Sequence, residues 1–224
     1  MTLTMSDQLS FDLPVRVATG RTEYFLSATN QMALDTIDDL ASWPQRKMMV
    51  LGPESCGKSH LLDIWISDNA AQKFDPLAVF DLPEPGANIV VDDLQNISGV
   101  MPAETRLFHL HNHLQSTGGT LLMASSLPVT QAGFQLPDLL SRLQGTACTR
   151  IEAPDDDLLH AVLLKNFMDR QLSPTPTIIA YILKNIDRTF IAASALVTEL
   201  DAQSMASKRP IGRKMVADVL SLKH

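Results

Sequence analysis

Eight residues in the first third of the chain have the types and the spacing needed to hold phosphate groups. They read GPESCGKS, span residues 52–59 and match the pattern G-x-x-x-x-G-K-[ST] without a mismatch. Gly52 and Gly57 lack a Cβ atom, so the backbone N–H groups around them can turn toward phosphate oxygens. Lys58 is spaced to reach the β- and γ-phosphates, and the Ser59 hydroxyl is a suitable Mg²⁺ ligand. A chance match in a chain of this length has odds of roughly one in a hundred, so we interpret the stretch as a phosphate loop.

The residues expected to contact a bound nucleotide are those of this loop and the one that follows it. They are Gly52, Pro53, Glu54, Ser55, Cys56, Gly57, Lys58, Ser59 and His60. Cys56 is interpreted as an ordinary loop residue rather than as a redox sensor.

A second acidic element follows the phosphate loop in the chain. The stretch NIVVDD at 88–93 predicts an apolar strand that ends in two aspartates. Asp92 is expected to hold Mg²⁺ through water, and Asp93 to polarise an attacking water. On its own such a pair is common at a solvated strand end; its place behind a phosphate loop favours the magnesium role.

Strands that alternate with helices must position these groups. Short apolar runs predict five strands, at 47–51, 77–80, 88–91, 120–125 and 148–152. Helical periodicity predicts helices between and before them, at 30–40, 59–70, 103–116 and 137–143. This alternation is typical of an α/β fold whose parallel sheet is covered by helices on both faces.

The pattern changes at Pro154, beyond which only helices are predicted. The first of these has an apolar face of Leu158, Leu159, Val162, Leu163 and Met168. The others are expected at 175–186, 189–206 and 211–222. We therefore predict three parts, which are a tail at 1–20, a nucleotide-binding α/β domain at 21–153 and a small helical lid at 154–224.

Composition and charge narrow the class of protein. No apolar run approaches the roughly 18 residues that a membrane span needs, so no membrane association is expected. Cys56 and Cys148 are the only cysteines and lack CxxC spacing, which indicates a reducing, cytoplasmic setting. The formal net charge of −7 disfavours the nucleic-acid backbone as the main partner.

Three alternate histidines invite a metal-site interpretation that the geometry of a helix disfavours. His109 and His113 share one face of the predicted helix, whereas His111 points elsewhere. No carboxylate or cysteine lies at a convincing ligand spacing, so we expect no metal there.

Three motifs together resemble a known family. The segments GKSHLL at 57–62, VVDDLQNI at 90–97 and LPDLLSRL at 136–143 are similar, in order and spacing, to the AAA+ replication initiator DnaA. They are closer still to its truncated relatives of the Hda type, which shut DnaA off. The likeness runs from about Tyr24 to the end of the chain. It implies an AAA+ core with a helical lid, ADP or ATP with Mg²⁺ as cofactors, and adenine contacts near Tyr24 and Phe25, although either residue could equally belong to the core.

The same resemblance implies roles for residues outside the phosphate loop. Arg142 falls on the family's arginine finger, which projects into the nucleotide site of a neighbouring subunit. The alternative is a surface arginine paired with Asp138 one turn earlier. At two sensor positions the sequence departs from the family, because Ser126 replaces an acidic or amide residue and Ile191 replaces the lid arginine. Arg188, three residues earlier, is a possible substitute, and weak intrinsic ATPase activity is expected.

The opening segment QLSFDLP resembles the peptides by which replication proteins dock on the sliding clamp of DNA polymerase III. Gln8 would form hydrogen bonds at the mouth of the clamp's groove, and Phe11 and Leu13 would fill its pockets beside Leu9. The alternative is a tail that covers the protein's own core.

The resemblance implies a regulator that promotes hydrolysis of DnaA-bound ATP through Arg142. Its expected partners are DnaA, the sliding clamp and a second copy of the chain. Direct sequence-specific DNA binding is not expected, because the initiator's DNA-binding domain needs roughly 90 further residues and the basic segment at 207–214 suits a solvated loop. One alternative is a P-loop adaptor or helicase-loading accessory protein with little catalytic role. A small-molecule kinase is disfavoured, because no arginine cluster for an acceptor lies near the loop.

Overall fold

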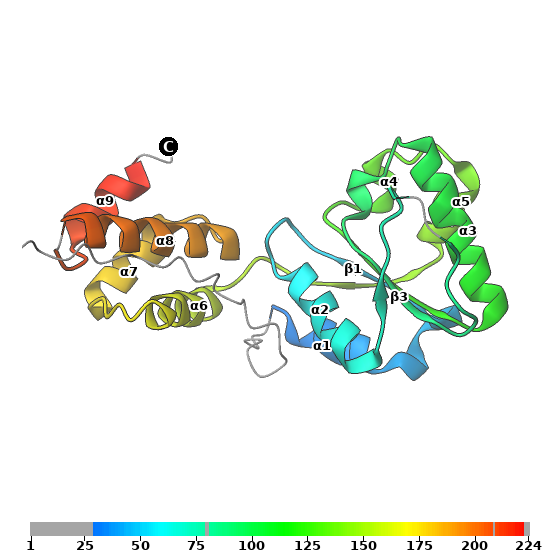
Figure 1. Cartoon of the computed structure of the whole chain (residues 1–224), viewed down its shortest axis with the longest axis horizontal. Helices are drawn as coiled ribbons and strands as arrows, with labels where there is room; N and C mark the ends of the chain where they lie inside the picture. Colours follow the sequence, from blue (N-terminus) through cyan, green and yellow to red (C-terminus); the bar gives the residue numbers. More distant parts are fainter. Residues whose placement is uncertain (1–28, 79–80, 208, 222–224) are drawn as a thin grey trace, which may run out of the picture.

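The computed structural model describes residues 29–78, 81–207 and 209–221. Within these ranges five strands form one parallel sheet in the order β2-β3-β4-β1-β5 (Figure 1). Their bounds are β1 Lys47–Leu51, β2 Gln72–Lys73, β3 Asn88–Val91, β4 Thr120–Ser125 and β5 Ala147–Arg150. The predicted five-stranded parallel sheet is confirmed.

Helices cover both faces of this sheet. They are α1 Gln31–Asp38, α2 Lys58–Asn69, α3 Met101–Thr117, α4 Val129–Ala132 and α5 Pro137–Gln144, with single 3₁₀ turns at η2 Leu40–Ser42, η3 Pro44–Arg46 and η4 Leu94–Asn96. Successive strand residues face opposite sides, so Met48 and Val50 pack against α1 and α2, whereas Met49 packs against α3 and α5. Figure 1 shows these two helix pairs on opposite sides of the sheet. Double coverage explains why the central strands read as continuous apolar runs.

The strand predicted at 77–80 is wrong. Leu77 lies in a turn and is exposed, and residues 79–80 lie outside the described residues. The edge strand is β2, in which Gln72 and Lys73 pair with Ile89 and Val90. Both β2 residues are exposed and polar, as is common at a sheet edge, so no apolar run marks this strand in the sequence.

The helices expected beyond Pro154 form and share an apolar core of their own. They are α6 Asp156–Asp169, α7 Pro176–Asn185, α8 Phe190–Ser207 and α9 Arg213–Ser221. In Figure 1 they lie beside the α/β layers. The Asp155 carboxylate caps α6 by accepting the Leu158 N–H at 2.8 Å. The domain boundaries at 20/21 and 153/154 stay predictions.

The predicted apolar face of α6 is wrong at one position. Met168 is 72% exposed, whereas Phe167 is fully buried. Leu159, Leu163 and Phe167 recur at intervals of four residues and form the buried face, which leaves Met168 outside it. No helix in the described part of the chain has the length and apolar character needed to cross a membrane.

Replacing Phe167 and Met168 separately should distinguish buried from exposed positions of α6. We expect Phe167→Ala to lower the free energy of unfolding by about 3–5 kcal/mol, because it leaves a cavity in the core of the helical part. Met168→Ala should change it by less than about 0.5 kcal/mol. Urea unfolding followed by circular dichroism measures both. Equal losses would contradict the assigned face.

Candidate nucleotide site

The phosphate loop connects β1 to α2, and its two glycines are required by close contacts. A Cβ atom on Gly52 would lie 2.4 Å from the carbonyl oxygen of Ile151 and 2.8 Å from the Cys56 sulfur. Gly57 precedes the first residue of α2 with φ +99°, a left-handed conformation that L side chains rarely adopt. The backbone therefore approaches its neighbours more closely than any residue with a side chain allows.

Lys58 is held inside the loop by backbone oxygens. The residue is 5% exposed, and its Nζ donates to the carbonyl oxygens of Gly52 at 2.9 Å and Pro53 at 2.7 Å. An ammonium has three donors, so a third remains for a phosphate oxygen. This arrangement, at the N-terminus of α2, is suited to an anionic ligand.

The other expected contact residues of the loop differ in their exposure. Pro53, Glu54 and Ser59 are exposed, and Ser55 and His60 are half-buried. Burial raises the pKa of the Cys56 thiol, although the nearby Lys58 charge opposes the shift. A protonated, buried thiol agrees with the interpretation of Cys56 as an ordinary loop residue.

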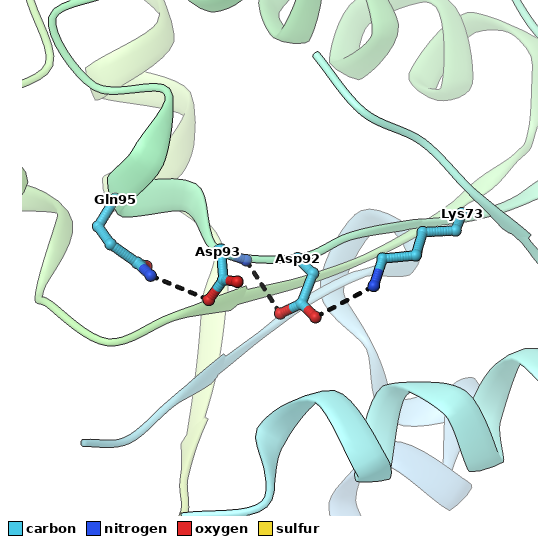
Figure 2. Close-up of polar contacts among 4 residues, drawn as sticks. All are labelled: Lys73, Asp92, Asp93 and Gln95. Carbon is cyan, nitrogen blue, oxygen red and sulfur yellow. Dashed lines mark hydrogen bonds and ion pairs between the residues drawn. The ribbon is translucent and has the colours of Figure 1, made fainter. Parts of the chain in front are cut away.

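The two aspartates after β3 form a chain of polar contacts (Figure 2). Asp92 Oδ2 lies 3.3 Å from Lys73 Nζ on the edge strand β2, and Asp92 Oδ1 accepts the Asp93 N–H at 2.9 Å. Asp93 Oδ1 in turn accepts from Gln95 Nε2 at 2.9 Å. The carboxylate expected to face Mg²⁺ thus already has a lysine beside it. Sequence reasoning missed this cation because it missed β2.

Parallel topology brings the phosphate loop, Ser126 and the aspartates to one edge of the sheet. Strands β1, β4 and β3 lie side by side, so β1 and β3 are about 10 Å apart. The Ser126 N–H donates to Gln95 Oε1 at 3.0 Å, so the Gln95 amide links the ends of β3 and β4. The segment VVDDLQNI contains this glutamine, but nothing in its spacing indicated the second contact.

These residues fit a nucleotide phosphate with a magnesium ion. The Ser59 hydroxyl and the Asp92 carboxylate are oxygen ligands of the kind that Mg²⁺ prefers. The glycine cradle and the Lys58 ammonium would hold the phosphates of the nucleotide. The bound group would supply the phosphoryl chemistry, while the chain supplies position and charge.

The helical part reaches the phosphate loop through the start of α8. The Phe190 N–H donates to the Ser55 carbonyl oxygen at 3.3 Å, and a ring carbon of Phe190 lies 3.0 Å from where a Cβ atom on Gly57 would be. Ile191 is 68% exposed, and Arg188 forms an ion pair with Asp156 at 2.9 Å. The side chain next to the loop is thus an aromatic ring, and the suggested substitute Arg188 is paired elsewhere.

Arg142 lies near the amino ends of the strands, opposite the ends that carry the phosphate loop. It is in the last turn of α5, and β5 begins three residues after this helix, where Ala147 pairs with Met48 near the start of β1. The five residues of β1 span about 16 Å between these amino ends and the phosphate loop. The Arg142 side chain is exposed and has no hydrogen bond or ion pair to any described residue, so the alternative pairing with Asp138 does not form.

Arg142 contributes to the electrostatics of two buried groups. Burial first, and then the Arg142 charge, lower the pKa of Lys47 to about 8. Burial, Lys47 and Arg142 lower the pKa of His111 to about 4, so the imidazole is neutral at pH 7. His113 Nε2 is 2.8 Å from the Pro83 carbonyl oxygen. Within the described ranges, no group of three or more histidine, cysteine or acidic side chains could hold a metal ion.

The residues expected to bind the clamp and the adenine base lie outside the described residues. They are Gln8, Leu9, Phe11, Leu13, Tyr24 and Phe25. Their assignments stay predictions.

Comparison with known proteins defines the class of this fold. No protein-family model matches the chain. The AAA domain of FIGL-1 in complex with ADP aligns with a TM-score of 0.67 at 11% identity, over 86% of this chain and 81% of that chain. The chain therefore has the fold of the AAA+ ATPases, a P-loop nucleotide-binding fold.

Within this class the neighbours include the replication initiator DnaA. Domain III of DnaA from Thermotoga maritima aligns with a TM-score of 0.74 at 16% identity, over 93% of this chain and 98% of that domain. DnaA from Aquifex aeolicus bound to AMPPCP aligns at 0.64 and 15%, over 83% of this chain and 66% of that chain. At these identities the likeness shows the fold alone, which is an AAA+ fold like that of DnaA domain III.

Lys58→Ala should reduce affinity for ADP by about 100-fold, because it removes the charged donor expected to contact the phosphates. The matched control is Lys184→Ala, which removes an exposed lysine from α7. Calorimetric titration well below the melting temperature measures both. Unchanged affinity in the Lys58 variant would contradict the assignment of the phosphate loop.

Proposed function

We propose that this chain is a regulator of replication initiation of the Hda type. It binds ADP or ATP with Mg²⁺ at its phosphate loop, and it promotes hydrolysis of ATP held by a DnaA partner. The observation that carries the proposal is the position of Arg142, an exposed guanidinium without a partner among the described residues. The DnaA-related AAA+ fold supports it.

The separation of Arg142 from the phosphate loop favours action on a second molecule. About 16 Å of strand divide it from the chain's own phosphates, which is too far for an arginine side chain to reach. In a neighbouring AAA+ subunit the guanidinium would stabilise the charge that develops on the transferring phosphoryl group. Arg142 is therefore assigned the role of arginine finger in trans.

The chain's own site is better suited to holding a nucleotide than to turning it over. Asp93 is the proposed base, but Gln95 donates to its carboxylate, and Ser126 adds only a hydroxyl. Phe190 rather than a cation faces the loop from α8. A cation from the lid would stabilise the γ-phosphate during cleavage, so its replacement by an aromatic ring favours slow intrinsic hydrolysis.

The proposal also includes a contact with the sliding clamp and a contact between two copies of the chain. Gln8, Leu9, Phe11 and Leu13 are assigned to the sliding clamp of DNA polymerase III, which would bring the protein to replicating DNA. The protein acts in the cytoplasm, with DnaA as its client and a homodimer as a possible resting form.

The contact between Lys73 and Asp92 favours a second candidate function. An ammonium at the carboxylate competes with a magnesium ion, which suits an adaptor or helicase-loading accessory protein whose phosphate loop is catalytically silent. Hydrolysis of DnaA-bound ATP, measured with and without DNA-loaded clamp, separates the two. The regulator accelerates hydrolysis when the clamp is present, and the adaptor does not.

Arg142→Ala should abolish this acceleration while leaving folding and ADP affinity nearly intact. Arginine fingers contribute on the order of 10³-fold or more to turnover where they act. The matched control is Arg209→Ala, an exposed arginine of the helical part. Full stimulation by the Arg142 variant would refute the finger assignment.

Gln8→Ala combined with Leu13→Ala should destroy affinity for the clamp, because the docking peptide loses both its hydrogen bond and one apolar anchor. Under this assignment the peptide contributes to the clamp interface and not to the fold, so the melting temperature should stay within about 2 °C of the parent. Surface plasmon resonance on immobilised clamp and a thermal melt test this. A large fall in melting temperature with clamp binding retained would assign the peptide to the fold.

A further inference from the structure

A buried carboxylate holds the N-terminal end of α5, the helix that carries Arg142. Glu104 in α3 is 0% exposed. Its Oε1 accepts the N–H of Gly99 at 2.6 Å and that of Gln135 at 3.1 Å. Its Oε2 accepts the N–H of Gln135 at 3.0 Å and that of Leu136 at 2.7 Å. One side chain thus satisfies three backbone donors.

The start of α5 depends on this carboxylate because its own residues cannot cap it. Leu136 occupies the cap position with no side-chain acceptor, and Pro137, the first helical residue, has no N–H. The negative charge of Glu104 also lies at the positive end of the helix dipole. Without it, three backbone donors beside a buried side chain would lack their acceptor.

Besides the bonds to Glu104, α5 is held by contacts with α3 and α4 and by the short connection to β5. Leu139 and Leu143 are buried against α3, and both lie on one face of the helix. These apolar contacts hold the helix against α3, whereas the hydrogen bonds to Glu104 also have a direction, which sets where the helix begins. The helix is only about 12 Å long, so a shift at its first turn is transmitted to Arg142 in its last turn.

We propose that Glu104 is a positioning residue for Arg142. Its carboxylate fixes the origin and direction of α5, and it thereby sets where the guanidinium projects from the protein. The same carboxylate holds Gly99, in the loop that follows η4, and the Ser98 hydroxyl in that loop donates to the Ala132 carbonyl oxygen. The finger helix is therefore fixed to the segment that follows the acidic strand β3. This inference rests on the proposed function.

Glu104→Gln tests the proposal with little change of shape. The neutral amide keeps one acceptor oxygen, and its NH₂ group cannot accept from the N–H groups that the second oxygen served. The full-length variant is titrated against DnaA loaded with ATP, in the presence of DNA-loaded clamp. We expect the maximal rate of hydrolysis to fall by on the order of 10–100-fold, with the half-saturating concentration unchanged, because a small misplacement of a catalytic group affects the rate rather than binding.

A purely structural role would give a different result. A partly unfolded variant has less active protein, so more of it is needed for half-saturation while the maximal rate is retained. Hydrogen exchange provides an independent measurement, since loss of these bonds accelerates exchange at Gly99 and over residues 135–143 and leaves the rest of the chain unchanged. Uniform acceleration over the whole chain, or an unchanged maximal rate, overturns the inference. Glu199→Gln, an exposed position on α8, is the matched control.

Failure of the inference and failure of the proposed function are distinguishable. If Arg142→Ala abolishes stimulation and Glu104→Gln does not reduce it, the finger stands and the positioning role falls. If Arg142→Ala stimulates fully, the proposed function fails and the inference fails with it. Should Glu104→Gln not fold, Glu104→Asp replaces it. This variant keeps the charge but shortens the reach by one methylene, and a lower maximal rate supports the role while an unchanged one refutes it.

Discussion

The parallel pairing of the strands is the constraint on which the rest of the structure depends. Because the five described strands run in one direction, all their carboxyl ends lie along one edge of the sheet and all their amino ends along the other. We call these the carboxyl edge and the amino edge. The carboxyl edge collects the phosphate loop, Ser126 and the two aspartates, and the helix N-terminus that follows β1 adds positive potential there. The amino edge collects Lys47 and the end of α5. A single chain can therefore carry a phosphate site on one edge and an exposed arginine on the other, with the apolar layers between them.

Much of the carboxyl edge could be predicted from sequence because its information is local. The phosphate loop, β1, β3 and β4 were read from contiguous residues whose types are dictated by burial or by phosphate chemistry. The predictions from sequence were wrong where burial leaves no clear pattern of apolar residues. Strand β2 has two exposed residues, and the apolar face of α6 shifts from Met168 to Phe167.

The missed site residues share a different property. Lys73, Gln95, Glu104 and Phe190 act through contacts with residues distant in the chain, or through atoms of the backbone. Glutamate in the first turn of a helix is ordinary, so Glu104 gave no signal that it caps another helix 31 residues later. Such pairings are set by the topology of the sheet, and no local spacing encodes them. For the same reason the proposed role of Arg142 rests on a resemblance between sequences, whereas its distance from the phosphate loop could be known only from the fold.

The positively charged side chains at the two edges differ in whether they already have hydrogen-bond or ion-pair partners. At the carboxyl edge Lys58 is bonded to two carbonyl oxygens, and Lys73 faces Asp92. Each cation there already has an anionic or dipolar partner, so it gains less from a further ligand. Arg142 has none among the described residues, and in water an exposed guanidinium is stabilised by hydration alone. Enclosed in an interface beside a triphosphate it would exchange that hydration for charged, bidentate contacts, which strengthen as water is excluded. Under the proposed function, the largest change in its interactions would therefore come on binding a partner's phosphates, and a rigidly held helix would allow that change to favour one geometry.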